Sequence, residues 1–310
     1  MITSGTIGDV TEVEFYEAAK DRWAAWFAER RHGGDPASLR RTLEFLAPVR
    51  DRVIQNAGLE RGGRLLDVGC GDGLIAFAAL DALGPSGEVI FSDISSDLLE
   101  RCRELARSAR ILDRCIFLEA PARDLSPVES GSVDAVTVRS VLIYENERPR
   151  AFGEFNRVLR AGGRLSLYEP INRFSHPEPE DRFYGYDASA VEEIAAKVKA
   201  VYERAQPHDS CSMLDFDERD ILALAQQAGF REVHLSLEAD VEPYESSPWR
   251  MSWETMLQSA FNPLAPTLDE AMAEALTSEE ADRFTSHLRP LVEAGQGVGR
   301  RASVYLWAIA

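Results

Sequence analysis

Short apolar runs alternate with amphipathic stretches along most of the chain, and this alternation predicts its secondary structure. The apolar runs predict strands at 64–68, 88–93, 115–119, 133–138, 164–169, 230–237 and 302–310. Apolar positions at helical spacing predict helices at 11–31, 37–57, 73–83, 97–109, 148–159, 190–204 and 217–228. Because strands that alternate with helices pair in parallel through right-handed crossovers, we expect an α/β fold with a doubly wound sheet.

Two insertions interrupt the alternation, at 171–216 and 240–299. The remaining segments form the expected core, which consists of 61–170, 217–239 and 300–310. The second insertion contains an apolar stripe at helical spacing, formed by Trp249, Trp253, Met256, Leu257 and Phe261. We expect the insertions and the N-terminal helical segment 1–60 to cover the carboxyl ends of the strands as lids. The alternative is that their aromatic residues only pack against the sheet.

The stretch from Arg64 to Ile75 is the most informative motif. Its apolar strand ends in three glycines at alternate positions, Gly69, Gly71 and Gly73, and a helix-forming run follows. Glycine permits a positive φ and a close approach of the backbone to a ligand. The succession of strand, glycine turn and helix therefore predicts a nucleotide-like ligand at the start of the helix.

The residues around this turn restrict the chemical class of ligand that it can bind. A phosphate-binding Walker loop is excluded because the turn has no lysine. In one frame of the dinucleotide fingerprint, Leu74 stands where the third glycine belongs; in the other frame, Ala76 is a tolerated variant. Asp67 and Asp72 favour a ligand that carries positive charge and no phosphate, although aspartate is also common in turns.

Asp93 ends the second predicted strand, beside the glycine turn in a parallel sheet. A carboxylate at this position can accept hydrogen bonds from both hydroxyl groups of a ribose. The alternative is that Asp93 only caps the following helix.

The composition of the chain restricts which binding partners and which cellular location we expect for the protein. The formal net charge of -18 argues against nucleic acid and anionic membranes as partners. The four cysteines are scattered without a Cys-x-x-Cys pair, so we expect no zinc site, no disulfide and a reducing cytoplasm. No apolar run approaches the roughly 20 residues of a membrane span, and the first residues lack the pattern of a signal sequence.

Five motifs resemble, in the same order, those of the class I S-adenosylmethionine-dependent methyltransferases. They are Leu65–Gly73, Asp93, Ala120–Leu125, Ser132–Val136 and Arg157–Leu165. The resemblance implies a Rossmann-like, seven-stranded sheet whose last strand is inserted antiparallel. It also implies S-adenosylmethionine as the cofactor and S-adenosylhomocysteine as the product.

The resemblance further implies a cofactor site. Its residues are Asp67, Gly69, Cys70, Gly71, Asp93, Ile94, Pro121, Ala122 and Arg139. Asp67 and the glycine turn would hold the methionine end, Asp93 the ribose, and Ile94 the adenine. The family often has an acid where Pro121 stands, so Asp124 or a backbone carbonyl becomes the candidate for binding adenine N6. Arg139 would lie near the methionyl group or the substrate.

Candidates for binding the methyl acceptor follow the fourth and fifth strands or lie in the first insertion. They are Tyr144, Glu169, Asn172, Arg173, His176, Tyr184 and Tyr186. The tyrosines suit an apolar or aromatic substrate, and the arginine suits a carboxylate. No catalytic base and no metal ligand can be assigned from the sequence.

We therefore predict a methyltransferase that acts by in-line displacement on a small metabolite or a modified peptide, with oxygen as the expected acceptor atom. The alternatives are a nicotinamide-dependent oxidoreductase on a similar sheet and a non-catalytic cofactor-binding module. A monomer or homodimer is expected, with no nucleic acid or membrane partner.

Overall fold

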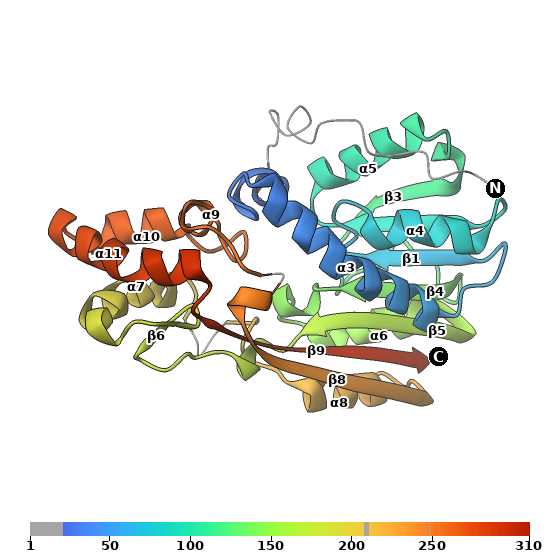
Figure 1. Ribbon diagram of the computed structural model, residues 1–310. Helices are drawn as coiled ribbons and strands as arrows, with labels where there is room; N and C mark the ends of the chain where they lie inside the picture. The colour runs from blue at the N-terminus through green and yellow to red at the C-terminus, as the bar shows by residue number, and fades with distance from the viewer. Residues whose placement is uncertain (1–20, 208–210, 248) are drawn as a thin grey trace.

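The computed structural model describes residues 21–207, 211–247 and 249–310 of the 310-residue chain (Figure 1). A twisted sheet with helices on both faces forms the larger part of the molecule. A group of helices lies beyond one end of this sheet, at the start of its last strand, β9. Because β9 runs against the parallel strands, this end is the one where the parallel strands have their carboxyl ends.

The sheet has seven strands, β1 (Arg64–Val68), β2 (Glu88–Asp93), β3 (Cys115–Glu119), β4 (Val133–Arg139), β5 (Leu159–Pro170), β8 (Glu232–Pro243) and β9 (Val298–Ile309). Their order is β3-β2-β1-β4-β5-β9-β8. Strands β1 to β5 are parallel, and β9 is antiparallel to both of its neighbours. The predicted Rossmann-like sheet with the last strand inserted antiparallel is therefore confirmed.

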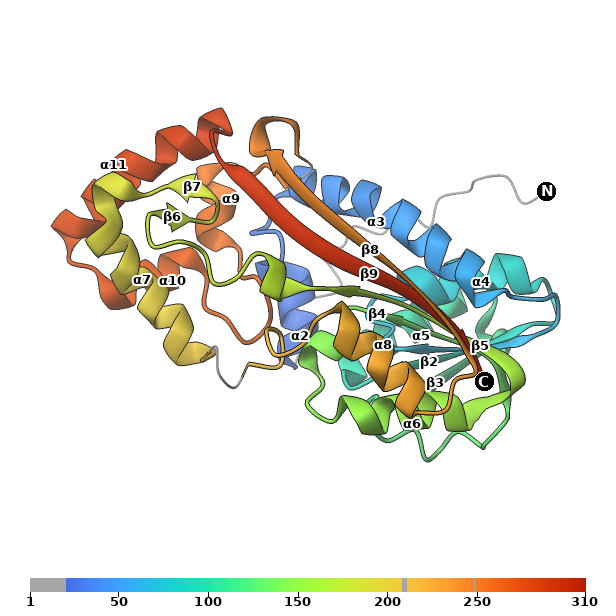
Figure 2. The ribbon, with the colours of Figure 1, turned by 90° about the horizontal axis from the view of Figure 1, so that it is seen from below.

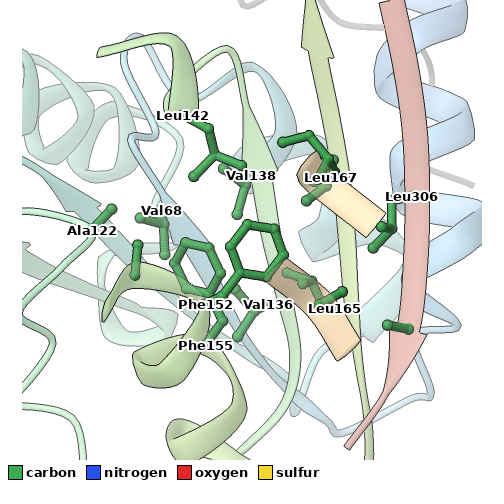
Figure 3. Close-up of a cluster of buried hydrophobic side chains, with 14 of the residues drawn as sticks. Val68, Ala122, Val136, Val138, Leu142, Phe152, Phe155, Leu165, Leu167 and Leu306 are labelled. Atoms are coloured by element: carbon green, nitrogen blue, oxygen red, sulfur yellow. The ribbon is translucent and has the colours of Figure 1, made fainter. Parts of the chain in front are cut away.

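Helices cover both faces of the sheet (Figure 2). One face carries α3 (Pro36–Ala57), α4 (Leu74–Leu83) and α5 (Ser96–Ser108), and the other carries α6 (Arg148–Val158) and α8 (Glu218–Gln227). On the second face, Phe152 and Phe155 of α6 pack against apolar residues of β4 and β5, including Val136 and Leu165 (Figure 3). Burial on both faces explains why the central strands are continuous apolar runs.

A second hydrophobic cluster holds together what we call the cap. The cap consists of the hairpin β6 (Arg182–Phe183) and β7 (Tyr186–Asp187) with helices α7 (Glu192–Ala205), α9 (Trp253–Gln258), α10 (Leu268–Ala275) and α11 (Ser278–Ala294). Phe183, Tyr186 and Phe284 are its largest fully buried side chains. The two inserted segments thus share a core of their own, separate from that of the sheet.

The strap, residues 21–35, joins the sheet to the cap. It contains α2 (Arg22–Ala25) and the π-helix η1 (Trp26–Arg30). At its first residue, the Ser95 hydroxyl donates a hydrogen bond to Asp21 Oδ2 at 2.6 Å, and nearer its middle the Trp26 indole donates to the Ala260 carbonyl at 2.8 Å. The strap is therefore fixed both to the start of α5 and to the segment after α9.

Short 3-10 helices complete the described elements: η2 (Leu112–Arg114), η3 (Leu142–Tyr144), η4 (Asn172–Phe174), η5 (Ser189–Val191) and η7 (Tyr244–Ser246). No helix in the described part of the chain is both long and apolar enough to cross a membrane.

Several local predictions differ from the structure, among them the strand predicted at 164–169, which begins at Leu159 as β5. The helix predicted at 11–31 falls partly on residues outside the described ranges, and the described remainder is α2 followed by a π-helix. The stripe predicted from Trp249 to Phe261 is helical only in α9, because the backbone N–H of Ala260 donates to the Arg30 carbonyl of the strap instead of continuing the helix. Strands β8 and β9 extend beyond their predicted ranges because they pair with each other over their full length.

Candidate functional site

A cavity of about 700 Å³ lies where the sheet, the strap and the cap meet. The sheet contributes residues that follow the parallel strands, among them Gly69, Gly71, Asp93, Ile94, Ala122 and Arg139. The strap contributes Trp23, Trp26, Phe27, Arg31 and His32. The cap and the segments beside it contribute Tyr184, Tyr186, Tyr244, Trp249, Met256 and Phe261. A ligand bound at the glycine turn therefore shares one space with a ligand bound by the cap.

The glycine turn requires glycine for two reasons. Gly69 has φ +65° and Gly71 has φ +55°, backbone conformations that residues other than glycine rarely adopt. A Cβ at Gly69 would lie 2.2 Å from Val141 Cγ2, and one at Gly71 would lie 3.2 Å from the Phe27 ring. The backbone of the turn is thus packed directly against the segment after β4 on one side and the strap on the other.

Asp93 is held in a fixed orientation beside this turn. Its Oδ2 accepts the backbone N–H of Gly71 at 2.8 Å, and its Oδ1 accepts that of Ser95 at 2.9 Å. The N-cap of α5 is Ser95, whose hydroxyl accepts the N–H of Leu98 at 3.1 Å. Asp93 is therefore not the helix cap, and it lines the cavity with a carboxylate whose pKa is raised by burial.

Asp67 and Cys70 lie behind the turn and do not line the cavity. Asp67 Oδ1 accepts the hydroxyl of Thr137, its neighbour across β1 and β4, at 2.7 Å. Burial raises the pKa of Asp67 to about 7 and also raises the pKa of the Cys70 thiol. Asp67 therefore lies beneath the glycine turn, on the side away from the cavity. Its expected contact with the methionine end of the cofactor stays a prediction.

The expected adenine pocket has an apolar face and a nearby charged pair. Ile94 is 49% exposed although it is aliphatic, and it lines the cavity together with Pro121 and Ala122. Asp124, a candidate for binding adenine N6, does not line the cavity, and its side chain accepts the N–H of Ser126 instead. Glu145 does line it, buried and paired with Arg123 at 3.3 Å.

The strap supplies cavity residues that the sequence did not single out. The guanidinium of Arg31 lies over the rings of Trp26 and Phe27, at 5.2 Å and 4.9 Å from their centroids. Burial and the neighbouring Arg31 lower the pKa of His32 to about 4, so its imidazole is neutral at neutral pH. The only sequence feature that could have pointed to these cavity residues is the aromatic cluster Trp23, Trp26 and Phe27 followed by basic residues. Helical spacing alone, however, predicts that such a cluster is buried in the hydrophobic core.

The aromatic residues on the cap side contact one another in pairs. The ring centroids of Tyr184 and Phe261 are 4.6 Å apart in an edge-to-face arrangement, and those of Tyr186 and Tyr244 are 5.2 Å apart in a tilted one. On the sheet side, Tyr144 meets Trp23 edge-on at 4.9 Å. Burial raises the pKa of all four tyrosines, so their hydroxyls are neutral at physiological pH.

Of the residues proposed for the acceptor, Tyr144, Tyr184 and Tyr186 line the cavity, whereas Glu169, Asn172, Arg173 and His176 do not. Glu169 is fully buried, and its Oε1 accepts the N–H groups of Val141 at 2.8 Å and Leu142 at 3.1 Å. It thereby shapes the segment after β4 that contacts Gly69. Among the described residues, no group of three or more His, Cys, Asp or Glu side chains is arranged to hold a metal ion.

Known proteins resemble this chain in sequence. A family model for the methyltransferase domain matches residues 66–167. The ubiquinone/menaquinone biosynthesis C-methyltransferase UbiE of Rhizobium johnstonii is 32% identical over 181 residues, which are 57% of this chain and 68% of that protein. The chain belongs to the class I S-adenosylmethionine-dependent methyltransferases. The UbiE protein of Erwinia tasmaniensis is 33% identical over 136 residues, 44% of this chain and 52% of that protein's length.

A solved methyltransferase shares the fold. Geranyl diphosphate C-methyltransferase from Streptomyces coelicolor A3(2), crystallised with Mg2+, geranyl diphosphate and S-adenosyl-L-homocysteine, aligns with a TM-score of 0.51 at 15% identity. The alignment covers 89% of this chain and 86% of that one. Membership of the methyltransferase family makes S-adenosylmethionine the cofactor and sets aside the nicotinamide-dependent alternative.

The residues in the cavity suit this cofactor. The oriented carboxylate of Asp93 can accept ribose hydroxyls, and the exposed face of Ile94 can cover the adenine. Arg139 and Arg31 line the same cavity and suit the cofactor's carboxylate. When bound, S-adenosylmethionine supplies an electrophilic methyl group on a sulfonium.

Proposed function

We propose that this chain transfers a methyl group from S-adenosylmethionine to a hydroxylated aromatic or enolic small molecule. The observation that supports this most is the single cavity, which joins the glycine turn and Asp93 to the aromatic residues of the cap. Aromatic side chains favour planar apolar ligands. A cavity of about 700 Å³ that must hold cofactor and acceptor together suits a small molecule rather than a peptide.

The charges around the cavity favour an acceptor that becomes anionic. Among its described lining residues, the carboxylates are Asp93 and Glu145, and Glu145 is paired with Arg123. The cavity is also lined by three further arginines, Arg22, Arg31 and Arg139. One of these can bind the cofactor's carboxylate, and the others favour a phenolate or enolate over a protonated amine.

The chemistry requires a proton acceptor and alignment. A phenol or enol gives up its hydroxyl proton. Its oxygen, or the carbon next to the one that bears the oxygen, then bonds to the methyl carbon, and the carbon–sulfur bond breaks to leave neutral S-adenosylhomocysteine. After bonding at a ring carbon, that carbon loses its hydrogen as a proton and the oxygen is protonated again, which restores the phenol. Among the described residues that line the cavity, His32 is the only histidine, and its neutral imidazole is the proposed proton acceptor. Because its pKa is lowered to about 4, it is a weak base, and the role suits an acceptor whose hydroxyl is acidic. Alignment of the two reactants supplies much of the remaining rate enhancement.

The acceptor atom is proposed to be carbon or oxygen of the same activated group. Oxygen is the acceptor atom that we expected from the sequence, whereas the relatives at about one-third identity are named C-methyltransferases. A phenolate shares its charge between oxygen and ring carbons, so one site can serve either outcome. The names of the relatives favour carbon.

The cap and the strap are proposed to act as lids. The strap is bound to both the start of α5 and the cap, and it crosses the cavity between them. Release of either contact would open the cavity for exchange of substrate and product. In this proposal, the strap and the described parts of 171–216 and 240–299 that form the cap exclude water from the reacting groups.

Transfer of labelled methyl groups tests the proposal. The chain is incubated with S-adenosylmethionine labelled in the methyl group and with phenols, naphthols, β-dicarbonyl enols and primary amines in separate reactions. Label is expected in a phenol, naphthol or enol product, with Asp93→Ala inactive and the exposed Asp81→Ala as a matched active control. Label only in amines would overturn the proposed acceptor class, and mass fragmentation of the product assigns carbon or oxygen.

A further inference from the structure

The hairpin β6–β7 of the cap has a backbone conformation that its sequence does not favour. Its two-residue turn is Tyr184-Gly185, with φ +53° and φ +81°. Two-residue hairpin turns with positive φ at both positions prefer Asn-Gly or Asp-Gly, and a bulky residue there is strained. Tyr184 is nevertheless placed in this conformation, and its ring lines the cavity.

Glu178 holds this turn in place. Its Oε2 accepts the N–H of Tyr184 at 2.8 Å, and its Oε1 accepts the N–H of Gly185 at 2.6 Å. Two consecutive N–H groups that converge on one carboxylate form an anion-binding nest, and the anion here is supplied by the chain itself. Hydrogen bonds to a charged acceptor are stronger than neutral ones and can offset the strain at Tyr184.

The turn is also pressed against the start of β9. A Cβ at Gly185 would lie 2.3 Å from the Val298 carbonyl oxygen, so no larger residue fits there. The N–H of Val298 donates to the Gly185 carbonyl at 3.1 Å. This packing leaves Tyr184 directed to Phe261 and Tyr186 to Tyr244, both across the cavity from the sheet.

We propose that Glu178 is a positioning residue for the acceptor: by binding the Tyr184-Gly185 turn, it fixes the Tyr184 ring as one side of an aromatic-ring subsite completed by Phe261. The inference rests on the proposed function, because it assigns the ring of the acceptor to this subsite. Strained residues held by their surroundings are frequent at functional sites, and the strain here orients a cavity residue. Glu178 itself does not line the cavity and acts only through the turn.

Binding of 1-naphthol to the S-adenosylhomocysteine-saturated chain tests the inference, with the affinity for S-adenosylhomocysteine measured separately. Glu178→Gln leaves one acceptor for two N–H groups, and we expect the naphthol Kd to rise about tenfold while the S-adenosylhomocysteine Kd is unchanged. The matched control is Glu180→Gln, an exposed glutamate two residues away whose side chain does not contact the turn. Tyr184→Gly removes both the ring and the strain, so Glu178→Gln added to it is expected to have no further effect on naphthol binding.

The outcomes separate the two claims. A wild-type chain that does not bind S-adenosylhomocysteine contradicts the proposed function. If S-adenosylhomocysteine binds but 1-naphthol does not, the aromatic-ring subsite is wrong. If both bind and Glu178→Gln behaves like Glu180→Gln, or if its effect persists unchanged in the Tyr184→Gly background, the positioning role is wrong. Thermal unfolding of each variant shows whether a general loss of stability explains the change.

Discussion

Val141 lies so close to Gly69 that a Cβ on this glycine would come within 2.2 Å of Val141 Cγ2. The contact joins the turn after β1 to the segment after β4, and Glu169 holds that segment from behind through the N–H of Val141. The conformation of the glycine turn after β1 therefore depends on Val141, which follows β4. Substitution at Gly69 is expected to disturb both segments at once.

Gly69→Ala is expected to weaken binding of S-adenosylhomocysteine by at least about tenfold, because the new methyl group displaces Val141 and the turn with it. Gly131→Ala is a matched control, since Gly131 has φ +66° but nothing within 4 Å of a Cβ. The control should lose about 1 kcal/mol of stability from backbone strain alone and keep its affinity. Calorimetric titration and urea unfolding measure the two effects, and equal affinity losses in both variants would contradict the explanation.

Stability should depend on pH through Glu169. Burial raises the pKa of this carboxyl to about 7, and its Oε2 has no hydrogen-bond partner in the described structure. The folded chain therefore keeps a proton that the unfolded chain loses above its ordinary pKa of 4.5. The free energy of unfolding, relative to that of Glu169→Gln, should fall as the pH rises from about 4.5 to about 7 and then level off. Parallel urea-unfolding profiles for the two chains across this range would refute the assignment.

The hydrogen bond from the Trp26 indole to the Ala260 carbonyl should slow release of the cofactor product. Trp26→Phe removes the donor and keeps a ring, so S-adenosylhomocysteine should dissociate about fivefold faster, as expected for ~1 kcal/mol. Trp307→Phe is the control. Trp307 lies on β9, its ring stacks on that of His234 with centroids 3.9 Å apart, and it does not line the cavity. Stopped-flow displacement measures both rates, and the same rate in the two variants would argue against a closing role for the strap.

His32→Asn should reduce kcat for the acceptor by about 100-fold while leaving the Kd of S-adenosylhomocysteine within a factor of about two. His234→Asn, which changes an exposed histidine of β8, is the control. Because the pKa of His32 is lowered to about 4, its protonation should depress kcat only near and below that pH. An unchanged kcat in His32→Asn would remove this residue from the proton transfer.

The sheet could be predicted from the sequence, whereas most of the acceptor site could not. The strands and the glycine turn are encoded by short apolar runs and by residues such as Gly69, whose conformation only glycine tolerates. The strap and cap are instead defined by contacts between distant residues, such as Trp26 with Ala260, 234 positions apart. No local pattern signals that the N–H of Ala260 will end α9 by bonding to Arg30.

The turn at Tyr184 shows the same limit on a smaller scale. The dipeptide Tyr184-Gly185 lacks the favoured Asn or Asp at its first position, so its sequence gives a weak hairpin signal. Its conformation depends on Glu178, six residues away from Tyr184. The tyrosines could be named as acceptor candidates from their type, but their placement around one cavity required the tertiary structure.

A crystal structure of the chain with S-adenosylhomocysteine and 1-naphthol would show where the cofactor product and the acceptor ring bind. We expect the ribose hydroxyls on Asp93, the adenine against Ile94, and the naphthol ring packed against the contacting Tyr184 and Phe261 rings, with its hydroxyl toward the cofactor sulfur. Naphthol bound outside the cavity, or S-adenosylhomocysteine bound away from the Gly69 turn, would contradict this expectation.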